Sequence, residues 1–298
     1  MNDTFIFSFE HNIDSEVASH NTLSKLASQL KGGYYKQLII DLGKVTFIAA
    51  NQFAILGCIF DTYMSKYSNT ELYFKNMCPT IQTIIQKNGF GKHFGLGTIP
   101  DQFNTVIPYK IFTVNEIKEY ESYLTLKLFS RSDLPQMTNA FKHMIQDYLL
   151  EVFKNVSDHT SSKYVYSCGQ FFPKSSMLYF TIVDNGETIP YNVEHFFIKN
   201  NDTPPDNCLK WALQEGTTTS NTDSPRGIGL FLIKQFIQSN RGKLCIISGA
   251  ENYEFSSHKE RYIKLASAFP GTIVTLAFNL SDSSFYSMSD TDYTEIQF

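Results

Sequence analysis

The chain has 298 residues, a formal net charge of −4, 42% hydrophobic residues and 15% aromatic residues. This composition favours packed globular structure over disorder, and the length is sufficient for two domains of ordinary size. The sequence contains no long block of Lys and Arg, which argues against general nucleic-acid binding.

Cysteine spacing and apolar runs limit the class of protein further. The five cysteines form no C-x-x-C pair, so their spacing predicts neither a disulfide framework nor a zinc site. The N-terminus lacks the basic start and apolar core of a signal peptide. The apolar stretch FIAANQFAILGCIF has 14 residues, too few to span a bilayer. We therefore expect a cytoplasmic protein that does not bind membranes.

The first 105 residues predict a small α/β unit, because strand-like and helix-like apolar patterns alternate along them. The predicted order is a strand at residues 5–9, a helix that ends at Gly32, a strand within 36–48, a helix from Phe53 to Tyr67, a strand at 71–77 and a short helix that ends at Gly89.

The glycines and prolines of residues 94–108 are typical of a linker, and we place a domain boundary near residue 105. The second domain would cover residues 106–282, followed by an acidic polar tail at 283–298. Its predicted elements are a long amphipathic helix from Pro135 into the 150s, a hairpin of 163–172 with 177–183, about 40 irregular residues, a helix within 226–242, and strands at 243–249 and 272–280.

One face of the predicted long helix carries polar side chains. Glu151, Asn155 and either Asp158 or His159 are separated by three or four residues, so their side chains share a face beside the apolar stripe. A carboxylate and an amide one turn apart can hold a hydrated Mg²⁺ ion and orient water. The alternative is a solvated polar face on an amphipathic helix.

Two glycine-containing segments complete the pattern. Asp184 ends the strand-like run MLYFTIV, where a carboxylate can accept a hydrogen bond from an exocyclic amine, and Gly186 lets a flat ring approach the backbone. Gly227 and Gly229 open the next predicted helix, where free N–H groups and the helix dipole attract phosphate. Plain turns are the alternative for both segments.

In order and spacing, these three segments resemble the GHKL ATPase family, which includes gyrase, the heat-shock chaperone ATPase, histidine kinases and mismatch-repair ATPases. The resemblance covers about residues 130–280, and PGTIVTL is similar to the last Gly-Thr strand of the family. It implies a GHKL (Bergerat) α/β sandwich, an α+β arrangement with a mixed sheet covered by helices on one face. It also implies ATP and Mg²⁺ as cofactors, under a mobile lid at residues 191–226.

The resemblance also implies roles for single residues. Glu151 would be the catalytic general base, and Asn155 would be the Mg²⁺ ligand. Asp184 would bind the adenine amino group, supported through water by Thr272. The further implied cofactor-binding residues are Asp158, Gly186, Gly216, Thr217, Gly227, Gly229 and Leu230.

One position departs from the family pattern. Thr188 stands where the family usually has a second glycine. A β-branched side chain at this position stiffens the turn. We expect it to narrow the pocket near the ribose and to alter nucleotide binding.

Residues 1–105 resemble a STAS domain, the fold of anti-anti-sigma factors, through the stretch LIIDLGKVTFIAANQFAIL. In signalling members of that family a phosphorylatable serine opens the helix of this stretch. Here the corresponding sequence is Ala49-Ala50-Asn51-Gln52. We therefore do not expect regulation by phosphorylation at this place.

Together these patterns predict a Mg-ATP-binding regulatory switch, in which slow hydrolysis and lid closure control the interaction with a protein partner. Two alternatives stay open: a protein serine or histidine kinase of the anti-sigma type, and a non-enzymatic scaffold with a degenerate nucleotide site. A homodimer is compatible with the family resemblance, which is an argument by analogy.

Overall fold

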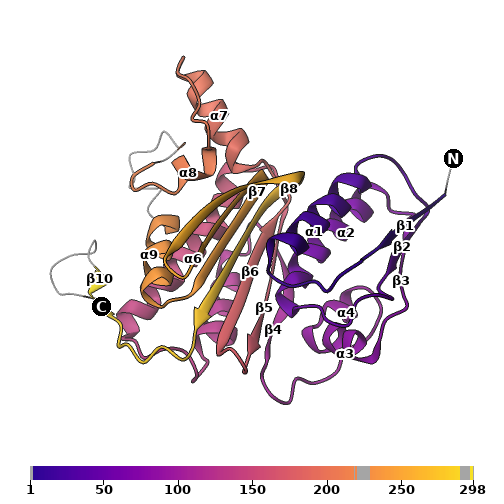
Figure 1. The fold of residues 1–298 in the computed structure, drawn as a ribbon, viewed down its shortest axis with the longest axis horizontal. Coiled ribbons are helices and arrows are strands. Elements are labelled where there is room, and N and C mark those ends of the chain that lie inside the picture. The colour runs from indigo at the N-terminus through magenta and orange to yellow at the C-terminus, as the bar shows by residue number, and fades with distance from the viewer. Residues whose placement is uncertain (1–2, 218, 220–228, 289–295, 298) are drawn as a thin grey trace.

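The computed structural model describes residues 3–217, 219, 229–288 and 296–297. The predicted α/β class is confirmed, with a parallel three-stranded sheet in the N-terminal part and an antiparallel five-stranded sheet in the remainder. Figure 1 shows helices α1 and α2 between the two sheets, and helices α6 and α9 on the opposite side of the larger sheet. Within the described ranges, every helix is too short or too polar to cross a bilayer.

The N-terminal part contains the six predicted elements. The strands β1 (Thr4–Ser8), β2 (Gln37–Asp41) and β3 (Glu71–Lys75) pair in parallel in this order. The helices are α1 (Val17–Leu30), α2 (Phe53–Lys66), α3 (Pro79–Asn88) and α4 (Phe90–His93). Gly89 ends α3 in the left-handed conformation, with a φ of 92°, which is the helix stop that the sequence predicts.

The five-stranded sheet is antiparallel, so the expectation of a mixed sheet is wrong. Its order is β4-β5-β6-β8-β7, and each of the four pairings is antiparallel. The strands β6 and β7 run in the same direction, but β8 lies between them because it returns from β7 by a hairpin. The bounds are β4 (Val106–Thr113), β5 (Tyr164–Phe172), β6 (Met177–Asp184), β7 (Lys243–Ser256) and β8 (Lys259–Asn279).

The helices of this part are α5 (Ile117–Tyr123), which continues as a π-helix over Leu124–Phe129, α6 (Asn139–His159), α7 (Ile189–Lys199), α8 (Cys208–Ala212) and α9 (Gly229–Ser239). The long helix α6 begins later than predicted, since the Thr138 side chain accepts a hydrogen bond from Phe141 N at 3.2 Å and caps it. Pro135 therefore precedes the helix. The helices α7 and α8 occupy part of the segment predicted to be irregular.

Described residues near the end of the chain pack against this helical layer. The strands β9 (Ser287–Met288) and β10 (Ile296–Gln297) form a small antiparallel pair. Tyr286, within the predicted tail, is buried, and its ring packs against Phe141 of α6 and Phe236 of α9. The start of the acidic polar tail is therefore part of the fold.

Both faces of the five-stranded sheet are buried. One face packs against α5, α6 and α9. The other face contributes Cys168 and Ile247 to a core that also contains Leu23 of α1 and Phe53 of α2. Asn51 Nδ2 donates a hydrogen bond to Thr181 Oγ1 at 3.0 Å inside this contact. The sheet is thus covered on both faces instead of one, and the domain boundary near residue 105 stays a prediction.

Candidate functional site

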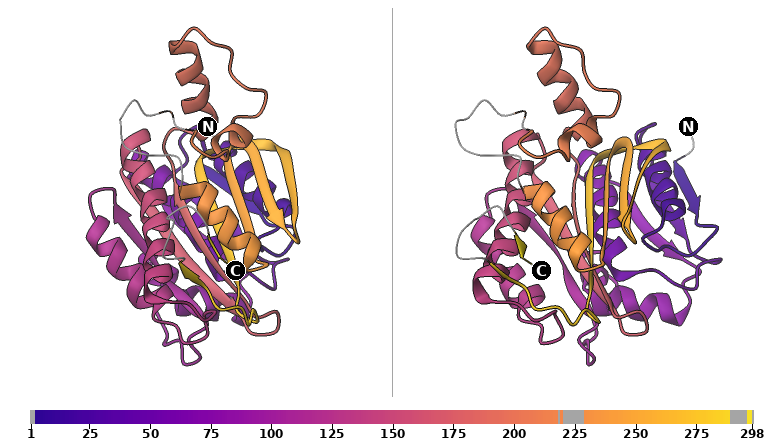
Figure 2. Two further views of the ribbon diagram at one scale, coloured as in Figure 1. Left: turned by 90° about the vertical axis from the view of Figure 1, so that its left-hand side faces the viewer. Right: turned by 60° about the vertical axis from the view of Figure 1, so that its left-hand side comes forward.

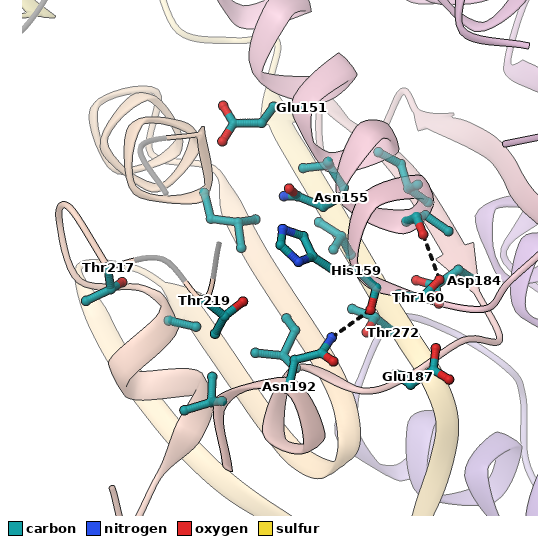
Figure 3. A pocket seen from close by; sticks show the side chains of 18 of the residues that line it. Glu151, Asn155, His159, Thr160, Asp184, Glu187, Asn192, Thr217, Thr219 and Thr272 are labelled. Carbon is teal, nitrogen blue, oxygen red and sulfur yellow. Dashed lines mark hydrogen bonds between the residues drawn. The ribbon is translucent and has the colours of Figure 1, made fainter. Parts of the chain in front are cut away.

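A cavity of about 140 Å³, open to solvent, lies between α6, the end of β6, the adjoining part of β8, and the segment of α7 and α8. Figure 3 shows the polar side chains that line it from these elements. Apolar side chains cover the remaining wall; they include Val152, Val156, Ile182, Ile189, Val193, Leu230 and Val274. A largely apolar cavity with a few convergent polar groups is typical of a small-molecule site.

The helix α6 contributes three polar side chains in a row. Glu151, Asn155 and His159 line the cavity and are half-buried, and Figure 3 shows them along one side of the helix. Their spacing of four residues places them on one face, as the sequence predicts. Asp158 lies on the exposed side of α6, where its Oδ1 accepts a hydrogen bond from Ser157 Oγ at 3.1 Å. Of the two candidates at this turn, His159 is therefore the one in the cavity.

Asp184 forms part of the cavity floor at the end of β6. It pairs with Thr272 of β8, which also lines the cavity, and its side chain is only 5% exposed. Its Oδ1 accepts a hydrogen bond from Gly186 N at 2.8 Å. Burial raises the pKa of Asp184 to about 7, the Gly186 N–H opposes this rise, and the charge of Glu187 adds to it. This carboxyl group therefore titrates near neutral pH.

Two glycines allow the turn after Asp184 to pack closely. A Cβ atom on Gly186 would collide with the side chain of Thr160, which follows α6. A Cβ atom on Gly271 would collide with the carbonyl oxygen of Asp184, and Gly271 has a φ of 143°. Gly186 is therefore required by packing within the protein, in addition to any approach of a ligand.

A chain of hydroxyl groups links the floor to α7. Thr272 Oγ1 and Ser248 Oγ are 2.8 Å apart, and Ile189 N donates to Ser248 Oγ at 2.8 Å. Ser248 was not a candidate from the sequence, since no motif contains it. Ser248 pairs with Thr272 across β7 and β8, and this strand register places Ser248 next to the cavity floor. The register cannot be read from the sequence.

Thr188, the departure from the family pattern, has a local structural role. Its Oγ1 accepts a hydrogen bond from Tyr191 N at 3.2 Å, which caps the N-terminus of α7. Among the described residues, those that line the cavity do not include Thr188. Its effect on the site therefore acts through the start of α7.

Two residues that sequence reasoning missed connect α7 and the preceding turn to the end of α6. Asn192 Nδ2 donates to the carbonyl oxygen of His159 at 3.0 Å, as Figure 3 shows, and the Glu187 carboxylate accepts a hydrogen bond from Ser161 N. Both side chains line the cavity. The spacing of residues along the sequence does not identify Asn192 or Glu187, because their hydrogen-bond partners are 33 and 26 residues away.

The segment after α8 forms the wall opposite α6. Thr217 and Thr219 line the cavity, and Thr217 Oγ1 donates to the carbonyl oxygen of Trp211 at 3.0 Å. Gly216, with a φ of 73°, turns the chain just before them. Two of the remaining candidates lie at the start of α9: Leu230 lines the cavity, and Gly229 is the first residue of the helix. Gly227 lies outside the described residues.

No protein-family model and no curated protein matches this chain. The resemblances to GHKL ATPases and STAS domains therefore stay predictions.

Proposed function

We propose that this chain binds Mg-ATP in the cavity between α6, the end of β6, the adjoining part of β8, and α7–α8, and that it acts as a nucleotide-controlled switch. The cavity combines a buried carboxyl group, Asp184, at its floor with an amide and a carboxylate, Asn155 and Glu151, one turn apart on the adjoining helix.

The floor has the chemistry of a purine site. An adenine amino group can donate a hydrogen bond to the Asp184 carboxylate, and Thr272 beside it can hold a bridging water. The side chains of Ile182, Val193 and Val274 supply apolar surface for the ring. With a pKa of about 7, the Asp184 carboxyl group is partly ionised at neutral pH, and a hydrogen bond donated by the amino group favours the ionised form.

The α6 side of the cavity suits a triphosphate and its metal ion. The Asn155 amide oxygen is a ligand type that Mg²⁺ accepts alongside water and phosphate. Glu151, one turn away and half-buried, can accept a proton from an attacking water or hydroxyl group. In this proposal, Asn155 holds the metal ion and Glu151 acts as the general base of a slow ATPase.

The switch would use the α7–α8 segment. This segment lines the cavity and is tied to the floor through Ser248 and to α6 through Asn192. A ligand that contacts both walls favours the closed arrangement by its differential affinity for the two states. The closed segment would then present a changed surface to a protein partner.

Calorimetric titration of ATP, with and without Mg²⁺, tests the proposal. The wild-type chain should bind Mg-ATP, and Asp184→Asn should weaken binding about 10- to 100-fold because a charge-assisted hydrogen bond is lost. Asn155→Ala should weaken binding only when Mg²⁺ is present. Absence of binding by the wild-type chain in both conditions would leave the non-enzymatic scaffold as the function.

A further inference from the structure

A second cluster, of potential metal-ligating side chains, lies where the N-terminal part meets the face of the five-stranded sheet that packs against α1 and α2. It consists of His20 on α1 and of Cys245 and Glu254 on β7. One potential ligand atom from each of these residues lies within 4.8 Å of the other two. His20 Nδ1 and Cys245 Sγ are 3.8 Å apart.

A sharp bend in β7 produces this cluster. Cys245 and Glu254 are nine residues apart, which corresponds to about 30 Å along a straight strand. The pairing of β7 with β8 is irregular on both sides of Gly249, which has a φ of 61°. Beyond this point the hairpin bends toward α1, as Figure 2 shows, and Ala266 N donates to Asn21 Oδ1 at 3.0 Å.

We propose that His20, Cys245 and Glu254 form a binding site for a transition-metal ion of the Zn²⁺ class. In tetrahedral zinc sites the Zn–N bond is about 2.0–2.1 Å and the Zn–S bond about 2.3 Å, which places nitrogen and sulfur roughly 3.6 Å apart. The distance of 3.8 Å between His20 Nδ1 and Cys245 Sγ is close to this value. Imidazole, thiolate and carboxylate are all established zinc ligands.

The imidazole of His20 is fully buried where α1 contacts β7. Within the described part of the chain, its Nε2 has no hydrogen-bond partner. Metal binding displaces the thiol proton of Cys245, which leaves to solvent as the metal–sulfur bond forms.

The cluster also has an entry path and a second layer of contacts. Cys245 and Glu254 line a cavity, partly open to solvent, that could admit the ion and a water as fourth ligand. Asn252 Oδ1 lies 3.5 Å from Cys245 Sγ, and its Nδ2 lies 3.5 Å from Glu254 Oε1. The charged groups around this cavity are of both signs: Glu16, Glu254, Lys243, Lys259 and Arg261.

A metal ion at this place would fasten α1 to β7 and hence join the two parts of the chain. Structural zinc sites contribute directly to folding free energy because the site is absent from the unfolded chain. Sequence spacing gives no signal for this site, since His20 is more than two hundred residues from Cys245. The proposal is independent of nucleotide binding.

Titration of Co²⁺ into the metal-free full-length chain tests the site. Co²⁺ bound to His20, Cys245 and Glu254 should give thiolate-to-cobalt charge-transfer absorption and the d–d bands of a tetrahedral ion. The absorption should saturate at one ion per chain, and added Zn²⁺ should displace the Co²⁺. Cys245→Ser should remove the charge-transfer band. Glu254→Gln should weaken binding by at least ~100-fold, above the usual effect of residues outside the ligand shell.

Two controls separate this site from other metal-binding groups. Cys78→Ser should keep the band, since Cys78 is the most accessible of the five thiols and lies outside the cluster. Asn155→Ala should also keep it, because the nucleotide cavity has no cysteine among its described lining residues.

Absence of the band in the wild-type chain, its persistence in Cys245→Ser, or unchanged affinity in Glu254→Gln would overturn the proposal. Glu254 is half-buried, so this variant decides the question if Cys245→Ser does not fold.

Discussion

Asn185 Nδ2 donates a hydrogen bond to Thr62 Oγ1 of α2 at 2.9 Å, while Asn185 Oδ1 accepts one from Ser162 Oγ at 2.7 Å. Asn185 directly follows Asp184, the buried carboxyl group of the cavity floor. The turn that carries the proposed adenine contact is therefore held from one side by the N-terminal part of the chain. This contact offers a direct physical connection between the cavity and α2.

Thr62→Val should weaken Mg-ATP binding. The substitution keeps the shape of the side chain and removes the hydroxyl acceptor, which leaves the Asn185 amide free to move. A net hydrogen bond of about 0.5–1.5 kcal/mol corresponds to a roughly 2- to 10-fold loss of affinity by calorimetry. The matched control is Thr22→Val on α1, whose hydroxyl bonds to Ala18 O of its own helix. Equal affinities in the two variants would refute a connection through Thr62.

Asp184→Asn should stabilise the protein at alkaline pH. Because the folded-state pKa of Asp184 is raised to about 7, the folded state binds the proton more tightly than the unfolded state does. Ionisation of Asp184 therefore lowers the unfolding free energy of the wild-type protein. This loss is absent at low pH, grows as the pH rises from the pKa of the unfolded state to that of the folded state, and is constant at higher pH. We expect the variant to gain on the order of 4 kcal/mol in unfolding free energy near pH 8.

Denaturant unfolding at about pH 4 and about pH 8 measures this effect. The gain in unfolding free energy of Asp184→Asn over the wild-type protein should be much smaller at the lower pH. Asp158→Asn, on the exposed side of α6, should change the unfolding free energy little at either pH. A gain in Asp184→Asn that is equal at both pH values would contradict the role of ionisation.

Gly186→Ala should destabilise the fold as well as the site. The added methyl group meets the side chain of Thr160 and the Ser162 backbone, and such overpacking costs about 1–3 kcal/mol. Gly33→Ala is the control, because a Cβ atom there has no neighbour within 4 Å. Denaturation midpoints of the two variants should differ clearly, with Gly186→Ala the lower. A midpoint of Gly186→Ala at or above that of the control would show that the turn relaxes without cost.

Glu151→Gln should keep Mg-ATP affinity and lose turnover, because the amide cannot accept the proton of the attacking group. Affinity is measured by calorimetry and turnover with ATP labelled at the γ-phosphate. Label recovered as free phosphate indicates an ATPase, and label on a protein indicates a kinase. Turnover that survives in Glu151→Gln would exclude this residue as the base.

The sequence predicts those parts of the site that depend on local periodicity. The apolar repeat of α6 determines its buried face, and this face places Glu151, Asn155 and His159 on the cavity side. The apolar run before Asp184 likewise predicts a buried strand end. These features need only the geometry of one helix or one strand.

The parts that the sequence does not predict depend on long-range pairing. Ser248 reaches the site through the register of β7 with β8, and Asn185 meets Thr62 across 123 positions. The apolar run of β6 is almost continuously buried, which is typical of a sheet covered on both faces. That pattern predicts a cover on the second face, but it does not identify the N-terminal part as this cover.

The apolar core between the five-stranded sheet and helices α1 and α2 leaves the N-terminal part little freedom to move as a separate body. Such a movement would expose Cys168 and Ile247 to water. If the chain binds nucleotide as proposed, we expect the accompanying movement in α7 and α8, which line the cavity. Val193 is the one buried side chain of α7, whose residues are all described. So little buried surface makes α7 the element that a ligand in the cavity displaces at the lowest cost in free energy.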